Sequence, residues 1–136
     1  MNKKGIYLLA VIFLTLSFTA CEEDLLNDDF RDELTGSWSV TENNNIKKSI
    51  MHYTVTISKS LSDTSVIRIA NFYDVSGTVE AEISDMNVSI PQQTVAGFTF
   101  NGYGTISGNL KEINWSYTVD HNNGFVDQVT ATYKKN

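Results

Sequence analysis

The sequence is poor in the residues that build covalent or metal cross-links. Its 136 residues include one cysteine, Cys21, and two histidines, His52 and His121. A single thiol cannot form a disulfide within the chain, and zinc sites usually take three or four Cys, His or carboxylate ligands at close spacing. We therefore expect neither a disulfide framework nor a metal site, and we expect both histidines at the solvent-exposed surface.

Basic residues are also few and scattered. The chain has ten Lys and Arg residues against sixteen Asp and Glu residues, a net charge of −6. Beyond the N-terminal Lys3-Lys4, basic residues are adjacent only at Lys47-Lys48 and Lys134-Lys135. Binding to nucleic acid requires clustered Lys and Arg to neutralise phosphates, so no nucleic-acid partner is expected.

Catalytic motifs are missing from the sequence as well. It has no serine elbow, no cysteine with a histidine partner and no carboxylate pair in a glycosidase-like context. The glycine-rich stretch from Gly97 to Gly108 lacks the Gly-Lys-Ser/Thr ending of a phosphate loop; it predicts two strands with a tight turn at Asn101-Gly102. We expect no enzyme and no cofactor. The weakest alternative is a glycan hydrolase that uses Asp74, Glu80 and Glu82.

Long apolar runs are confined to the N-terminus. Lys3 and Lys4 precede 14 uncharged, mostly apolar residues from Gly5 to Phe18. A helix needs roughly 20 residues to cross the hydrocarbon core of a bilayer, so this run is too short for a permanent span. A positive end followed by a short apolar run is typical of a signal peptide.

The end of this run distinguishes between two processing routes. The ordinary signal peptidase needs a small residue at the third position before the cut, where Phe18 stands if cleavage precedes Cys21. The stretch Phe18-Thr19-Ala20-Cys21 resembles a bacterial lipobox, with Phe in place of the more common Leu. The resemblance implies that residues 1–20 are a lipoprotein signal peptide and that Cys21 carries acyl chains such as palmitate. Several acyl chains hold a protein on a membrane almost permanently.

The segment that follows Cys21 is strongly acidic. Residues 22–33 contain seven acids and one base, whereas residues 34–136 carry a net charge of only −2. A run of like charges resists collapse, so residues 21–33 are predicted to form a solvated tether. The sequence Cys21-Glu22-Glu23-Asp24 also resembles the export signal of surface lipoproteins in one Gram-negative phylum. That resemblance implies anchoring in the outer membrane of the cell envelope, with exposure on its outer face.

The remaining residues, 34–136, are predicted to form one all-β domain. Apolar and polar residues alternate with a period of two, while no segment keeps a period of 3.6. The clearest strand has one apolar face made by Ile113, Trp115, Tyr117 and Val119. Short turns favour antiparallel neighbours, so we expect a meander of about eight strands. Such a meander closes into a barrel or folds into a sandwich, and we favour the barrel.

The start of this domain resembles a known family of barrels. Leu34-Thr35-Gly36-Ser37-Trp38 resembles the Gly-x-Trp signature of lipocalins and related calycin barrels; the Thr-Asp-Tyr element of true lipocalins is not visible. The resemblance implies a lipocalin-like barrel in which Gly36 begins the first strand and Trp38 plugs the closed end. It also implies a basic residue from the last strand packed over that Trp, for which Lys134 is the candidate.

Aromatic residues supply the signal for ligand binding. An eight-stranded barrel is just wide enough to be filled by side chains or to hold one small ligand. Both outcomes stay open; a residual pocket would be lined by Tyr53, Phe98, Trp115 and Tyr117 and would suit a small apolar or amphipathic molecule. At the pair Phe72-Tyr73 we expect one exposed ring, which could stack on a glycan or meet a protein partner.

These features favour a binding protein at the cell envelope. The leading hypothesis is a non-catalytic binding module, held on the membrane by its N-terminal lipid, that captures a small ligand. The alternative is a packed interaction domain without a pocket, acting as an accessory subunit of a surface protein complex.

Overall fold

The computed structural model describes residues 29–136. The predicted signal peptide, the lipidation site Cys21 and the predicted export signal Glu22, Glu23 and Asp24 lie outside these residues. Within residues 29–136, no helix has the length and apolar character needed to cross a bilayer.

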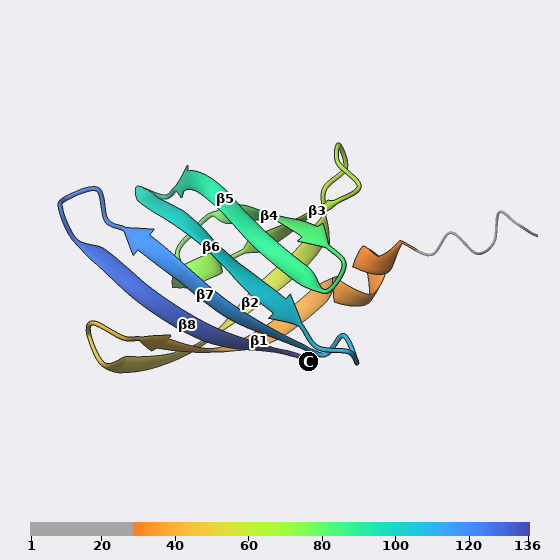
Figure 1. The fold of residues 1–136 in the computed structure, drawn as a ribbon, viewed down its shortest axis with the longest axis horizontal. Coiled ribbons are helices and arrows are strands. Elements are labelled where there is room, and N and C mark those ends of the chain that lie inside the picture. The colour runs from red at the N-terminus through yellow and green to blue at the C-terminus, as the bar shows by residue number, and fades with distance from the viewer. Residues whose placement is uncertain (1–28) are drawn as a thin grey trace, which may run out of the picture.

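Eight antiparallel strands form a closed barrel, in which each strand pairs with the next and the last pairs with the first (Figure 1). All-β architecture and barrel closure were both predicted, and both are confirmed. All eight strands and both ends of the barrel come from residues 29–136, so this part of the chain contains its own core. The strands are β1 (Gly36–Asn44), β2 (Ser49–Lys59), β3 (Val66–Ala70), β4 (Thr78–Ser84), β5 (Asn87–Val95), β6 (Phe98–Ile106), β7 (Glu112–Asp120) and β8 (Val126–Lys135).

Alternation along the strands separates the inside of the barrel from its outside. In β7 the residues Ile113, Trp115, Tyr117 and Val119 are buried, as predicted, while Asn114 between them is exposed. Burial of each large apolar side chain contributes about 1.5–3 kcal/mol. The inward residues of the eight strands together form one continuous core.

The connection between β5 and β6 differs from the prediction. The turn lies at Ala96-Gly97, where both residues have positive φ values of 52° and 85°, as a two-residue hairpin turn requires. The predicted turn at Asn101-Gly102 is wrong, because both residues lie within β6. Gly102 is required there for space: a Cβ atom would come within 2.3 Å of the Tyr117 Cβ on β7. Glycine in this strand marks a close approach rather than a turn.

The wall between β4 and β5 is completed by a side chain. Backbone pairing of these strands covers only Glu82 to Ser84, and the register of β5 shifts between Ile90 and Gln93. Pro91, which has no N–H to donate, lies within this bulge. The Gln93 side chain accepts from the Glu80 N–H and donates to the Glu80 carbonyl, both at 2.8 Å. Its amide thus takes the place of a backbone partner.

One end of the barrel is closed by the 3-10 helix η3 (Phe30–Leu34) and by Trp38. Both Leu34 and Trp38 are fully buried, and the Trp38 Nε1 donates to the Leu34 carbonyl at 2.8 Å. Trp38 therefore lies where the Gly-x-Trp resemblance places it. The candidate basic residue is wrong: Lys134 is exposed, and Lys135 is the register partner of Trp38. Lys135 donates to the Glu33 carbonyl, because alternation turns the odd-numbered residues of β8 inward.

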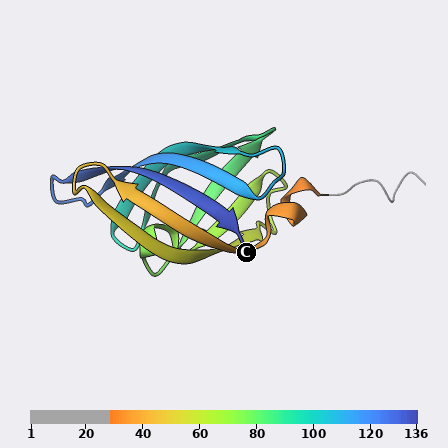
Figure 2. The ribbon, with the colours of Figure 1, turned by 90° about the horizontal axis from the view of Figure 1, so that it is seen from below.

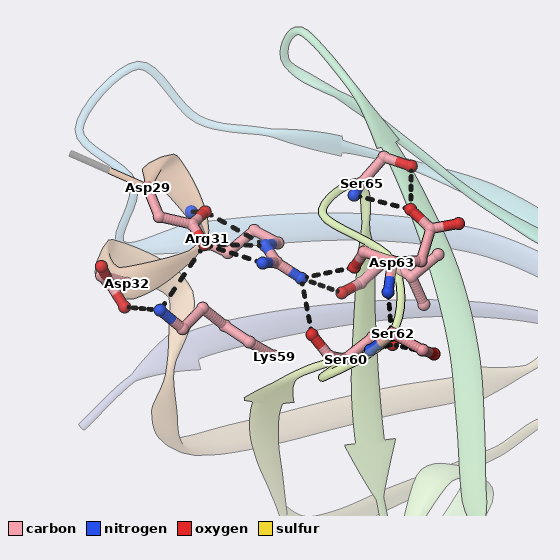
Figure 3. A network of polar contacts seen from close by, with 9 residues as sticks. Asp29, Arg31, Asp32, Lys59, Ser60, Ser62, Asp63 and Ser65 are labelled. Carbon is pink, nitrogen blue, oxygen red and sulfur yellow. Dashed lines mark hydrogen bonds and ion pairs between the residues drawn. The ribbon is translucent and has the colours of Figure 1, made fainter. Parts of the chain in front are cut away.

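Arg31 attaches η3 to the barrel (Figure 3). Its guanidinium is buried and donates to the carbonyls of Ser60, Asp63 and Val66 at 2.8–3.2 Å. The Asp29 carboxylate accepts from the same guanidinium, and this hydrogen bond holds the Asp29 pKa below its usual value. Residues 30–33, assigned to the tether from sequence, thus form a helix fixed to the β2–β3 connection.

We predict that Arg31→Met lowers the free energy of unfolding by about 2–3 kcal/mol, because it removes charged hydrogen bonds and leaves buried carbonyls with fewer donors. Lys59→Met is the matched control. Lys59 also pairs with Asp29 and Asp32, but it is partly exposed, and solvent-screened pairs contribute little to stability. Urea unfolding checks both variants; equal effects would contradict the role of Arg31.

Candidate functional site

The candidate site is the end of the barrel opposite η3, which we call the mouth. It is bordered by the β1–β2 turn (45–48), by the short 3-10 helix η4 (Phe72–Asp74) and by the β7–β8 loop (121–125). In two perpendicular views the β1–β2 turn and the β7–β8 loop both lie at the far end from η3 (Figures 1 and 2), and the Lys47 ammonium on the turn lies 5.6 Å from the centroid of the Phe125 ring on the loop. Two buried carboxylates lie within this mouth.

Glu42 is the first of these carboxylates. Its side chain extends inward from β1, is 2% exposed, and accepts hydrogen bonds from the hydroxyls of Tyr53 and Tyr117, the latter at 2.7 Å. Burial raises the Glu42 pKa, and the two hydrogen bonds, which lower it, do not fully offset that effect. Glu42 therefore binds a proton more readily than an exposed glutamate does.

Asp127 is the second carboxylate, and its side chain is 0% exposed. Its Oδ2 accepts from the Tyr73 hydroxyl and from His121 Nε2 at 2.8 Å, while Lys47 Nζ lies 3.6 Å away. Burial alone would raise the Asp127 pKa, but these hydrogen bonds, with a further contribution from Asn44, lower it to about 2. Asp127 is therefore ionised at neutral pH, and within residues 29–136 its Oδ1 has no hydrogen-bond partner.

Strand alternation explains why both carboxylates face inward. Glu42 continues the inward series of Trp38 and Val40 on β1, and Asp127 begins the series that continues with Val129 on β8. Sequence reasoning missed both carboxylates, because it followed apolar residues alone. Continuing the inward series of β1 from Val40 to Glu42, and that of β8 back from Val129 to Asp127, would have found both carboxylates.

The two histidines have different environments. His52 is exposed, as predicted. His121 was also expected in solvent, but this prediction is wrong, because its ring is half-buried against Asp127 and lies 5.0 Å from the Phe98 ring. The backbone N–H of His121 donates to the Phe125 carbonyl. This hydrogen bond closes the β7–β8 loop at the mouth. Among residues 29–136, no three His, Cys, Asp or Glu side chains gather as a metal site would require.

The structure places the four predicted ligand-binding residues in two layers. Tyr53 and Phe98 are half-buried near the mouth, where Tyr53 meets Tyr117 at Glu42. Trp115 and Tyr117 are buried more deeply, and both contact the Phe72 ring, at 6.1 Å and 4.8 Å between ring centroids. Ligand contact by these four residues stays a prediction.

The pair Phe72-Tyr73 fills this interior instead of presenting a ring to solvent. Phe72 is fully buried and Tyr73 is half-buried, so the prediction of one exposed ring is wrong. The pair lies on η4 rather than on a strand, and the positive φ values of Asn71, Tyr73 and Asp74 turn both rings inward. The acids Asp74, Glu80 and Glu82, named for the hydrolase alternative, are exposed.

A separate hollow lies at the closed end of the barrel. Its volume is about 470 Å³, and its walls include Phe30, Arg31, Ile83 and Met86. It lies beside η3 and the β4–β5 turn, at the opposite end from the two carboxylates, and it contains none of the predicted ligand-binding residues.

We predict that the free energy of unfolding of the wild type decreases as pH rises, and that Glu42→Gln removes this decrease. Between the usual glutamate pKa near 4.5 and the raised folded value, the native state holds a proton that the unfolded chain has lost, so stability falls with rising pH. Glutamine keeps an acceptor for both tyrosines and carries no charge. Each unit of pKa shift corresponds to about 1.4 kcal/mol.

Urea unfolding at several pH values from 4 to 9 measures this effect, with Glu82→Gln on the exposed face of β4 as the control. The same pH dependence in Glu42→Gln and the wild type would contradict the assignment. Asp127 acts in the opposite direction at lower pH: because its folded pKa is about 2, the stability that it contributes is lost as pH falls from about 4 towards 2.

Comparison with known proteins adds evidence on the fold. Neither a protein-family model nor a curated protein matches the chain. A solved structure described as a redesigned β-barrel is similar to it, with a TM-score of 0.60, 13% sequence identity, and coverage of 77% of this chain and 93% of that one. At this identity the similarity establishes the β-barrel fold alone.

Proposed function

We propose that the protein is a lipid-anchored lipoprotein of the bacterial cell envelope whose barrel is a non-catalytic binding module for a small amphipathic ligand. The observation that carries this proposal is the mouth. It combines an ionised, fully buried carboxylate, Asp127, whose Oδ1 has no hydrogen-bond partner in the described part of the chain, with the rings of Tyr73, Phe98 and His121. Apolar walls with a few oriented polar groups are typical of ligand sites.

The place where the tether joins the barrel is consistent with this function. Asp29 and η3 lie at the closed end, so a chain anchored through Cys21 enters there (Figure 1). In the proposed arrangement the closed end faces the membrane and the mouth faces away from it. A ligand then approaches the mouth from the aqueous side, and the acidic residues Glu22, Glu23 and Asp24 direct the protein to the outer face of the outer membrane.

Lipocalin-like architecture is part of the proposal. Its support is the fully buried Trp38 behind Gly36, and Lys135, which extends from the last strand to η3. The deep interior favours the second candidate function, a packed accessory domain. Phe72 makes edge contacts with Phe100, at 5.2 Å between ring centroids, and with Trp115. These rings fill the deep interior, so the proposed ligand binds at the mouth and not inside the barrel.

We predict that the protein, purified from its own host as a chain beginning at Glu22, carries a small-molecule mass in native mass spectrometry. The binding module accounts for this mass because an amphipathic ligand buries apolar surface at the mouth. A clean apo mass that no lipid or glycan panel changes would support the accessory domain instead. Phe98→Ala, which opens the aromatic wall of the mouth, is expected to reduce the bound fraction severalfold, whereas Tyr103→Ala, an exposed ring on β6, leaves it unchanged.

Anchoring is tested at the cysteine. Cys21→Ser removes the thiol to which the acyl chains attach, so we expect the unprocessed precursor to accumulate and the mature membrane-bound form to disappear. Phe18→Leu, which restores the more common lipobox residue, is the matched control and is expected to be processed normally. Membrane fractionation and immunoblotting measure both; a serine variant of mature size in the membrane fraction would overturn the anchor.

A further inference from the structure

A lysine already occupies the charged part of the mouth. The Lys47 ammonium lies 3.6 Å from the Asp127 Oδ2 and 5.6 Å from the centroid of the Phe125 ring, over its face. Lys47 belongs to the β1–β2 turn, and its side chain is 49% exposed. Carboxylates and aromatic faces both attract ammonium groups. The mouth thus binds a cation by two complementary contacts, one ionic and one aromatic.

The two partners of this ion pair differ greatly in burial. Asp127 is fully buried and ionised, whereas Lys47 is half-exposed at the tip of a turn. A buried charge needs close partners, but at 3.6 Å the ammonium lies beyond the usual hydrogen-bond distance. Within residues 29–136 the Asp127 Oδ1 is itself buried and has no hydrogen-bond partner, so the carboxylate is incompletely satisfied. Lys47 is therefore a weak and replaceable partner for Asp127.

The other charges near the mouth favour a cation as well. Asp74 on η4 and Asp127 both raise the Glu42 pKa by their negative charge, which indicates that the acids contribute to one local field. Exposed apolar side chains lie on the segments that border the mouth: Ile46 and Met51 on the β1–β2 hairpin, and Phe125 on the β7–β8 loop. A ligand with one ammonium group and an apolar body matches both features.

We propose that the mouth selects amphipathic organic ammonium compounds. The ligand's ammonium replaces that of Lys47 between Asp127 and Phe125, and its apolar body lies against Ile46, Met51 and Phe125. This inference rests on the proposed binding function and specifies the class of ligand. When the mouth is empty, the Lys47 ammonium occupies this place, so it competes with an incoming ligand. When the ligand binds, Lys47 moves towards solvent.

The test compares three probes of equal chain length, octylammonium, octan-1-ol and octanoate, each below its micelle concentration. They are titrated into the chain that begins at Glu22, with Kd measured by calorimetry and contacts mapped by NMR. We expect octylammonium to bind at least about tenfold more tightly than octan-1-ol and octanoate, with the largest shifts at Asp127 and Phe125. Asp127→Asn is expected to abolish this preference.

Two lysine variants keep the test informative even if Asp127→Asn fails to fold. Lys47→Met removes the competing ammonium and keeps the apolar stem, so octylammonium affinity is expected to rise several-fold while octan-1-ol affinity is unchanged. Lys48→Met, an exposed neighbour in the same turn, is the matched control and is expected to change neither affinity.

The outcomes separate the ligand class from the binding function. Equal affinity for octylammonium and octan-1-ol, or no gain in Lys47→Met, would overturn the ammonium proposal and leave the binding module in place. The same holds if none of the three probes binds but native mass spectrometry finds a copurifying ligand. Absence of both would overturn the binding module as well.

Discussion

Pairing of β8 with β1 is the constraint on which the rest of the structure depends. It closes the sheet, removes its free edges, and gives every strand one face towards a common interior. It also makes Glu42 the register partner of Ala131 and Asn44 that of Val129. The β1–β2 turn is thereby fixed beside the start of β8, and Lys47 lies within reach of Asp127. Without this closure the two carboxylates would be exposed side chains on separate strands.

The two ends of the barrel use their polar groups differently. At the closed end the Arg31 guanidinium satisfies three carbonyls, and the Trp38 Nε1 bonds to Leu34, so the polar groups there contribute to stability. At the mouth Asp127 is held ionised by Tyr73 and His121, and Glu42 is shifted towards its neutral form. Burial of a charge costs free energy, and strongly perturbed pKa values are common at functional sites.

Local signals were sufficient where a residue's neighbours in sequence determined its environment. The alternation around Trp115 predicted β7 and its inward face, and the short connections predicted antiparallel neighbours. They failed where a distant segment decided the outcome. The pair Asn101-Gly102 is typical of a turn, but Gly102 lies within β6. A glycine is needed there because Tyr117 on the next strand approaches too closely for any side chain. Phe72 and Tyr73 turn inward because η4 places them over the barrel interior.

The sequence by itself determined the alternating strands, the antiparallel order, the position of Trp38 at the start of the barrel, and the acidic segment that precedes it. Tertiary structure alone decided that Glu42, Asp127, His121 and Lys47 meet at one end, because these residues come from β1, β8 and two different loops. The shifted pKa values of Glu42 and Asp127 depend on the same assembly, since they require burial and partners that exist only after the barrel has closed.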